Sequence, residues 1–251
     1  MQDPRYYIEY APAAHLASYI DAYYVLRRDS SFKPVKRYIF ADGLAEIFVN
    51  LGSSIPMVDD KVPLKPGRLY FGGTMTTTSF ITGLPDTRFV GIRFKPGGLS
   101  AFYKLNQFEF VDKIVDLPQP ELYSIMYDDD KLVERLNRFF TRTLNPRVLP
   151  VLSISESVYN LRGQITVDAL ARQNNISRRS LERHFNSALG VGPKEFIKVI
   201  RFHNLIKKLQ SKESQESLLQ IAYEMGYYDH SHLIKEVRRY GGQTPSDILN
   251  H

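Results

Sequence analysis

The chain has 251 residues, 43% of them hydrophobic and 24% charged, a composition typical of a folded globular protein with one or two domains. Because it contains no cysteine, disulfides, thiolate metal sites and cysteine nucleophiles are excluded. No apolar run approaches the roughly 18–20 residues that span a bilayer, and the first residues lack a hydrophobic signal core, so we expect a cytoplasmic protein with no membrane partner.

The formal net charge of +6 is concentrated in one part of the chain. Residues 1–150 carry 19 Lys and Arg against 17 Asp and Glu, whereas residues 160–210 carry 10 against 3. A basic block inside a folded region indicates either a polyanionic partner or a solvated basic face, and charge alone does not choose between them.

Residues 1–110 predict a β-rich domain, because short segments rich in aromatic and β-branched residues alternate with Gly, Pro and Asp turns. Many short strands at this spacing are typical of a sandwich or a small barrel. A short helix is expected at Ala14–Ile20. The expected strands are Tyr6–Tyr10, Ala22–Arg27, Ala45–Asn50, Leu69–Phe71, Thr76–Ile81 and Phe89–Phe94.

Two segments close this domain. Lys95–Ser100 is rich in glycine but lacks the Gly-Lys-Ser/Thr ending of a phosphate-binding loop, so it predicts a turn into a short helix. Asp130–Leu144 has apolar residues at helical spacing, and this stripe packs on its own domain or on another subunit. The prolines within Asn145–Pro150 predict a boundary between a domain of residues 1–145 and one of residues 149–251.

Residues 166–249 contain the same pattern twice. Thr166–Ala171 aligns with Ser217–Ala222, and after one additional residue in the turn Leu181–Pro193 aligns with Leu233–Pro245. Helix caps, apolar positions, glycines and prolines stay in register, which indicates a duplicated supersecondary unit.

Each copy predicts a helix-turn-helix. In the first copy Thr166 caps one helix and Ser177 caps the next, with Asn174 and Asn175 in the tight turn between them. Gly226 occupies the turn of the second copy, and Asp229 caps its second helix. Between the copies, Lys194–Gln210 predicts a basic helix about 24 Å long.

The second helix of each copy presents polar residues on its exposed face, as expected of a helix that enters the major groove of DNA. The alternative for a single copy is a solvent-facing charged surface. In the first copy these residues are Arg178, Arg179, Ser180, Glu182 and Arg183, and in the second they are His230, Ser231, His232, Ile234 and Lys235. Candidate phosphate contacts are Thr166, Lys194, Lys198 and Ser217.

The segment Gly226–Leu233, followed by Gly242–Pro245, resembles the AraC/XylS family of bacterial transcription regulators, whose pattern is Gly-Phe-x-Asp-x-Ser-x-Phe and then Gly-x-Thr-Pro. The resemblance covers residues 150–249. The base-contacting positions that it implies are Arg179, Glu182 and Arg183 in the first unit and His230, Ser231, His232, Ile234 and Lys235 in the second.

The second unit departs from the family pattern at three positions. Leu233 and Val237 stand in place of Phe, and Gly241 stands in place of an aromatic residue. We therefore expect a less bulky interior there and a helix that ends early, at Gly241-Gly242.

The N-terminal part has a weaker resemblance of its own. Gly91–Gly98 and Asp112–Leu117 look like a β-rich domain found ahead of this DNA-binding module, and Ala41–Glu46 is similar to its Pro-Asp-Gly-x-x-Glu segment. That domain has no settled ligand, and its likeness to cupin barrels is an analogy of fold. A cupin-like metalloenzyme is disfavoured, because His15 is the only histidine in residues 1–150.

The sequence thus predicts an α+β protein with a β-rich barrel or sandwich followed by an all-α domain of two helix-turn-helix units joined by a linker helix. It is expected to regulate transcription, as an activator, by binding double-stranded DNA, with no cofactor, no metal and no enzymatic activity. RNA polymerase is an expected partner. The N-terminal domain either binds a small-molecule effector or serves only to form a homodimer or bind a protein partner.

Overall fold

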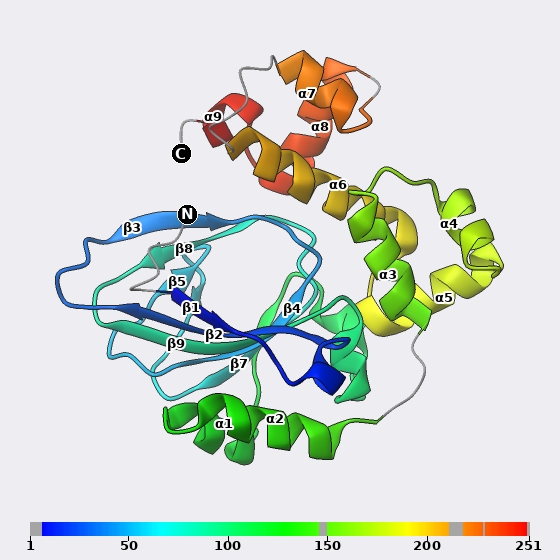
Figure 1. Ribbon diagram of the computed structural model, residues 1–251. Helices are drawn as coiled ribbons and strands as arrows, with labels where there is room; N and C mark the ends of the chain where they lie inside the picture. The colour runs from blue at the N-terminus through cyan, green and yellow to red at the C-terminus, as the bar shows by residue number, and fades with distance from the viewer. Residues whose placement is uncertain (1–6, 146–149, 211–217, 228, 250–251) are drawn as a thin grey trace.

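The structure of the protein is a computed structural model that describes residues 7–145, 150–210, 218–227 and 229–249 (Figure 1). The strands are β1 (Tyr7–Tyr10), β2 (Ile20–Arg28), β3 (Val35–Ile39), β4 (Ala45–Asn50), β5 (Met57–Val58), β6 (Val62–Pro63), β7 (Leu69–Gly72), β8 (Ser79–Gly83), β9 (Thr87–Phe94) and β10 (Ile114–Asp116). The helices are α1 (Pro120–Tyr127), α2 (Leu132–Thr143), α3 (Pro150–Asn160), α4 (Val167–Gln173), α5 (Arg178–Leu189), α6 (Pro193–Gln210), α7 (Leu218–Glu224), α8 (His230–Gly241) and α9 (Pro245–Leu249).

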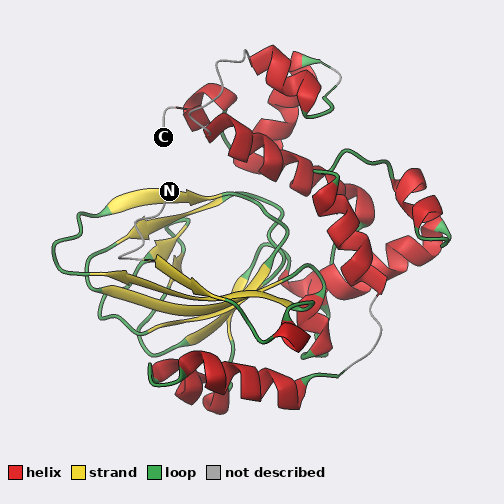
Figure 2. Ribbon diagram, in the orientation of Figure 1, coloured by secondary structure: helices red, strands yellow, loops and turns green. Residues whose placement is uncertain are grey.

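Two antiparallel sheets form the N-terminal domain. The larger has the strand order β1-β2-β9-β4-β7-β10 and the smaller the order β3-β8-β5-β6. Their strands pair over long distances in sequence: Tyr24 of β2 lies opposite Gly91 of β9, and Glu46 of β4 lies opposite Arg93 of β9. The described strands of both sheets all precede α1 along the chain, and Figure 2 shows them gathered in one part of the molecule.

The two faces of the larger sheet have different surroundings because side chains alternate along each strand. One face carries aliphatic and aromatic residues such as Tyr23, Ile47 and Ile92, which α1 and α2 cover with Leu136, Phe140 and their neighbours. The other face looks toward the smaller sheet. A second apolar cluster fills part of the space between the sheets, formed by Phe48, Val58, Leu64, Tyr70 and Phe89.

The C-terminal region is helical, with α6 as its central element (Figure 1). Phe196, Ile197 and Ile200 in the first part of α6 belong to a core shared with α3, α4 and α5. Phe202, Leu205 and Leu209 in the later part belong to a second core shared with α7, α8 and α9. One helix therefore carries a helix-turn-helix unit at each of its ends.

Most expected elements are present, with shifts at their ends. The predicted helix at Ala14–Ile20 is a single 3-10 turn over Ala14–Leu16, because β2 already begins at Ile20. The predicted turn and short helix at Lys95–Ser100 are confirmed, with Gly97 in the left-handed conformation (φ +81°) ahead of a 3-10 helix. The predicted domain boundary falls on residues 146–149, outside the described part of the chain.

Helix α8 ends at Gly241-Gly242 as expected, but it is not shorter than its counterpart α5. Helices α5 and α8 both have 12 residues, and each ends at the equivalent left-handed glycine, Gly190 or Gly242. The space that smaller residues leave in the second core is filled by Phe202 of α6 and Tyr240 of α8, whose ring centroids lie 5.8 Å apart. A Cβ at Gly241 would lie 3.3 Å from Phe202, so the glycine makes room for that ring.

Candidate DNA-binding interface and ligand cavity

The two helix-turn-helix units are built by the same local interactions. The Ser177 hydroxyl accepts a hydrogen bond from the Ser180 amide at 3.1 Å, and the Asp229 carboxylate accepts one from the His232 amide at 2.7 Å. These side chains satisfy amide groups that the first turn of a helix leaves unpaired. Asn175 (φ +52°) and Gly226 (φ +76°) provide the left-handed residue in the two turns.

The predicted base-reading residues of the first unit lie together on α5. Arg179, Glu182 and Arg183 are exposed on the face opposite the buried Leu181 and Phe185. Arg178 is exposed as well, and its Nε lies 3.2 Å from an Asp168 carboxylate oxygen on α4. Ser180 is half-buried, with its Oγ 3.3 Å from His184 Nε2.

The predicted residues of the second unit are less uniform. Ser231 and Lys235 are exposed on α8, whereas Ile234 is half-buried and packs against the second core. His232 is half-buried too, with its ring 5.5 Å from that of Tyr227. The side chain of His230 lies outside the described residues.

The candidate phosphate contacts differ in their exposure and in the hydrogen bonds or ion pairs that their side chains form within the protein. Lys194 is exposed, and Thr166 is exposed while its hydroxyl caps α4 by accepting from the Ala169 amide at 3.1 Å. Lys198 lies with its Nζ 2.8 Å from a carboxylate oxygen of Glu236, which is only 4% exposed. Lys198 thus joins α6 to α8 inside the domain. Ser217 lies outside the described residues.

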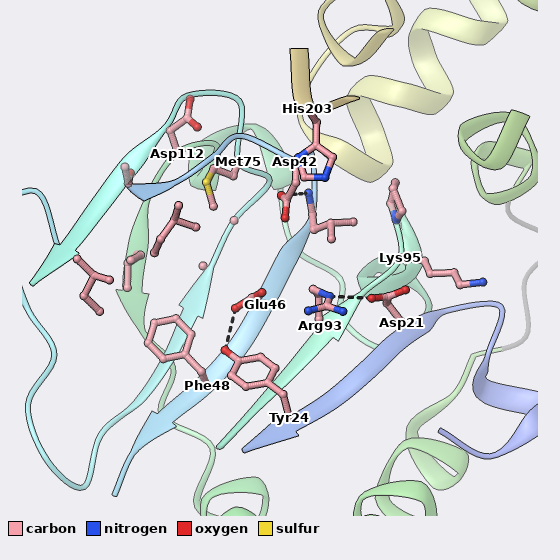
Figure 3. Close-up of a pocket in the computed structure, with 18 of the residues that line it drawn as sticks. Asp21, Tyr24, Asp42, Glu46, Phe48, Met75, Arg93, Lys95, Asp112 and His203 are labelled. Atoms are coloured by element: carbon pink, nitrogen blue, oxygen red, sulfur yellow. Dashed lines mark hydrogen bonds and ion pairs between the residues drawn. The ribbon is translucent and has the colours of Figure 1, made fainter. Parts of the chain in front are cut away.

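A cavity of about 1240 Å³ lies between the two sheets and extends to the helices of the C-terminal region (Figure 3). It is lined by inward-facing residues of β2, β4, β8 and β9, and by residues of α3 and α6 such as Tyr159 and His203. This site was not found from the sequence. The only local signal was the segment Ala41–Glu46, whose two acidic residues both face the cavity.

Two carboxyl groups dominate the end of the cavity nearest α6. The Glu46 carboxylate accepts a hydrogen bond from the Tyr24 hydroxyl at 2.8 Å, and the Asp42 carboxylate accepts one from the Leu44 amide at 2.9 Å. Burial raises the pKa of Asp42 to about 6. Burial and, after it, the nearby Asp42 raise the pKa of Glu46 to about 7.

Basic groups partly offset the effect of burial on this acidic pair. Arg93 and Lys207 lower the pKa of Asp42, and Arg93 lowers that of Glu46, although burial outweighs them. The guanidinium of Arg93 also donates to Asp21 at 2.7 Å (Figure 3) and lies 2.9 Å from Glu9. Burial and the neighbouring Lys207 lower the pKa of His203 to about 4, so its imidazole is neutral near pH 7. No group of three or more His, Cys, Asp and Glu side chains suited to a metal ion occurs within the described ranges.

The segment that bears Asp42 also contacts both helix-turn-helix units. Ala41 is fully buried in the second core, and the Phe40 ring lies 6.5 Å from that of Phe202. A Cβ on Gly43 would lie 2.9 Å from the Phe196 ring of the first core. The Tyr159 hydroxyl donates to the Asp42 carbonyl at 2.5 Å. Residues 40–43 thus link the cavity to α3 and α6.

Comparison with known proteins matches both parts of the chain. Residues 170–251 match a family described as a helix-turn-helix domain, and residues 8–116 match a domain of unknown function, DUF6597. The HTH-type transcriptional regulator GbdR of Pseudomonas aeruginosa is 31% identical over 108 residues, which are 42% of this chain and 28% of GbdR. An uncharacterized HTH-type transcriptional regulator of Haemophilus influenzae is 32% identical over 80 residues, 32% of this chain and 26% of that protein. The chain therefore matches little more than a quarter of the length of either relative.

Solved structures of ToxT from Vibrio cholerae match nearly the whole fold. One has a TM-score of 0.53 at 14% identity and covers 98% of each chain. A second, of ToxT with a bound unsaturated fatty acid, has a TM-score of 0.50 at 15% identity and covers 99% of this chain and 96% of ToxT. No helix among the described residues is long and apolar enough to cross a membrane. Residues 170–251 are therefore similar to a family of helix-turn-helix domains, and the chain as a whole has a ToxT-like two-domain fold.

Proposed function

We propose that this protein is a transcription regulator that binds a specific sequence of double-stranded DNA through α5 and α8. The observation that carries the proposal is the pair of capped helix-turn-helix units held on the single helix α6 (Figure 1). With 18 residues, α6 is about 27 Å long. Adjacent major grooves on one face of DNA recur about every 34 Å, so one chain can present two helices to successive grooves.

Sequence recognition is assigned mainly to the first unit. Arg179 and Arg183 are exposed, charged and free of ion pairs among the described residues, so their guanidinium groups are available to base edges. Arginine pairs with guanine through two parallel hydrogen bonds that contribute about 1–3 kcal/mol of discrimination. In the second unit, Ser231 and Lys235 present the exposed polar groups, while Ile234 and His232 are engaged in packing.

The candidate phosphate contacts Lys194, Thr166 and Lys198 are assigned to the DNA backbone. Lys194 and Thr166 stand at the N-terminal ends of α6 and α4, where phosphate contacts are favourable. Lys198 is a weaker candidate because its ammonium group is paired with Glu236. Because phosphate contacts release counterions, the affinity should fall steeply with salt.

A binding assay with Arg183→Ala tests this assignment. A DNA site selected from a random library is titrated with the wild-type chain, with Arg183→Ala and with Arg138→Ala, an exposed arginine of α2 that serves as the matched control. We expect Arg183→Ala to weaken the selected site about 10-fold or more and random DNA only slightly, with no effect of Arg138→Ala. Equal losses on both DNAs would make Arg183 a phosphate contact, and failure to select any sequence would contradict the proposal itself.

We further propose that a small molecule bound in the cavity controls DNA binding. The regulator is proposed to act in the cytoplasm as a homodimer and to activate transcription through RNA polymerase. The support for an effector is the cavity itself, its contact with α6 through residues 40–43, and the ToxT structure with a bound fatty acid. A ligand that displaces residues 40–43 would move the contacts that hold α6.

A further inference from the structure

The cavity contains a second charged group at the end away from Asp42 and Glu46. Arg28, the last residue of β2, is only 9% exposed and lines the cavity. Among the described residues its guanidinium forms no hydrogen bond or ion pair. A buried arginine without an anionic partner is costly, because the charge loses its hydration and gains no ion pair in exchange.

The guanidinium of Arg28 is nevertheless held in a defined place. It lies over the Phe32 ring, 4.5 Å from the ring centroid. On another side it packs against Gly83 of β8, where a Cβ would lie 2.1 Å from its Nη1 atom. The glycine therefore makes room for the guanidinium, and the side chain is positioned before any ligand arrives.

A second arginine increases the positive charge at this place. Arg37 of β3 lies opposite Ile81 of β8, two residues from Gly83, and also lines the cavity. Burial, and then repulsion from Arg37, lower the pKa of Arg28 to about 10. Arg37 likewise has no ion pair among the described residues. Two uncompensated guanidinium groups facing one cavity form a site suited to a carboxylate, which each can bind with two hydrogen bonds.

The strand register separates this site from the acidic pair. Arg28 lies opposite Thr87 of β9, and Glu46 lies opposite Arg93 of the same strand. Six residues of β-strand at about 3.3 Å each place the two backbone positions about 20 Å apart. The stretch between them is apolar and includes Leu26, Phe48 and Phe89. The cavity therefore carries two arginines at one end, is apolar in the middle, and at the other end combines the acidic pair with the basic groups Arg93, Lys95 and Lys207.

We propose that the cavity binds an organic carboxylate whose acid group is held by Arg28 and Arg37 and whose apolar part extends along Leu26, Phe48 and Phe89. This inference rests on the proposed effector site and names the chemistry and the orientation of its ligand.

Calorimetric titration of the full-length chain tests the proposal, with decanoate and 1-naphthoate as probes and decylammonium as the probe of opposite charge. Arg28→Met removes the charge and keeps the apolar stem. Arg37→Met does the same at an exposed position, where loss of folding is not expected. The matched control is Arg27→Met, because Arg27 is adjacent but pairs with Asp129 at 2.8 Å and is not among the cavity residues.

We expect at least one carboxylate to bind the wild-type chain and both cavity variants to weaken it about 10-fold or more, with Arg27→Met within twofold of wild type. Gly83→Ala should also weaken binding without removing a charge, because its Cβ displaces the guanidinium. Glu46→Gln should leave carboxylate affinity unchanged or raise it. Circular dichroism of each variant verifies its folding.

Absence of binding by both carboxylates at millimolar concentration would overturn the proposal. So would equal affinity of the wild-type chain and both cavity variants, or tighter binding of decylammonium. The carboxylate and DNA measurements test different proposals. Carboxylate binding through Arg28 without selection of any DNA sequence would contradict the regulator proposal alone. Specific DNA binding without carboxylate binding would contradict this inference alone.

Discussion

Replacement of Glu46 by glutamine should stabilise the protein at alkaline pH and have little effect at acidic pH. Burial raises the pKa of this carboxyl from its ordinary value of 4.5 to about 7. The folded protein therefore binds the proton more tightly than the unfolded chain does. The stability that this provides is fully present below about pH 4.5 and is lost as the pH rises through about 7.

The size of the effect follows from the two pKa values. The difference between 4.5 and about 7 corresponds to about 3 kcal/mol, which is the cost of the ionised carboxylate in the folded protein at pH 8. At pH 5 the corresponding cost is below about 1 kcal/mol. Glutamine has no charge, and its amide oxygen still accepts the hydrogen bond from Tyr24.

Urea unfolding followed by circular dichroism at pH 5 and pH 8 measures both values. Glu46→Gln should raise the free energy of unfolding by up to about 3 kcal/mol at pH 8 and by less than about 1 kcal/mol at pH 5. Glu109→Gln, at an exposed position, should change neither. An equal gain at both pH values, or no gain at pH 8, would refute the argument from burial.

Three further substitutions test contacts that hold the domains and helices. Gly43→Ala should cost about 2 kcal/mol of stability, because φ at this position is +73° and the new Cβ meets a ring of α6. The control Gly67→Ala has a similar φ of +71° but no close contact, so it should cost about half as much. Thermal unfolding measures both losses. Asp229→Ala should cost about 1 kcal/mol through loss of the α8 cap, seen as a lower melting temperature. Lys198→Met should cost about 2 kcal/mol, because it removes the ammonium group that pairs with the buried Glu236 carboxylate and leaves only His232, at 3.6 Å, beside it. Adding Glu236→Gln should recover most of the loss, and no recovery would argue against the ion pair.

The helix-turn-helix units could be predicted from sequence because their signals are local. Ser177 and Asp229 cap helices through amides three residues later, and Asn175 and Gly226 mark the turns by their tolerance of positive φ. Duplication made the pattern stronger, since two aligned copies repeat the same requirements. The end of α8 at Gly241-Gly242 is local as well and was predicted, whereas the filling of the second core by Phe202 could not be, because Phe202 comes from another helix.

The cavity could not be predicted because its residues come from strands far apart in the sequence. Tyr24 and Glu46 meet only after β2 and β4 have each paired with β9. Arg28 is one of several arginines along the chain, and its burial depends on the position of β8. The contact between the Thr78 amide and the Tyr240 carbonyl, 2.7 Å long, joins residues of different domains and has no local signal.

The central claim is that one chain reads DNA with two helices held on α6, and hydroxyl-radical footprinting on a selected DNA site tests it most directly. Each bound chain should give two protected blocks on one face of the DNA, about 10 base pairs apart, from α5 and α8 in successive major grooves. Arg183→Ala should weaken the block that belongs to α5 first. A single block for each bound chain, or protection that is independent of sequence, would contradict the account.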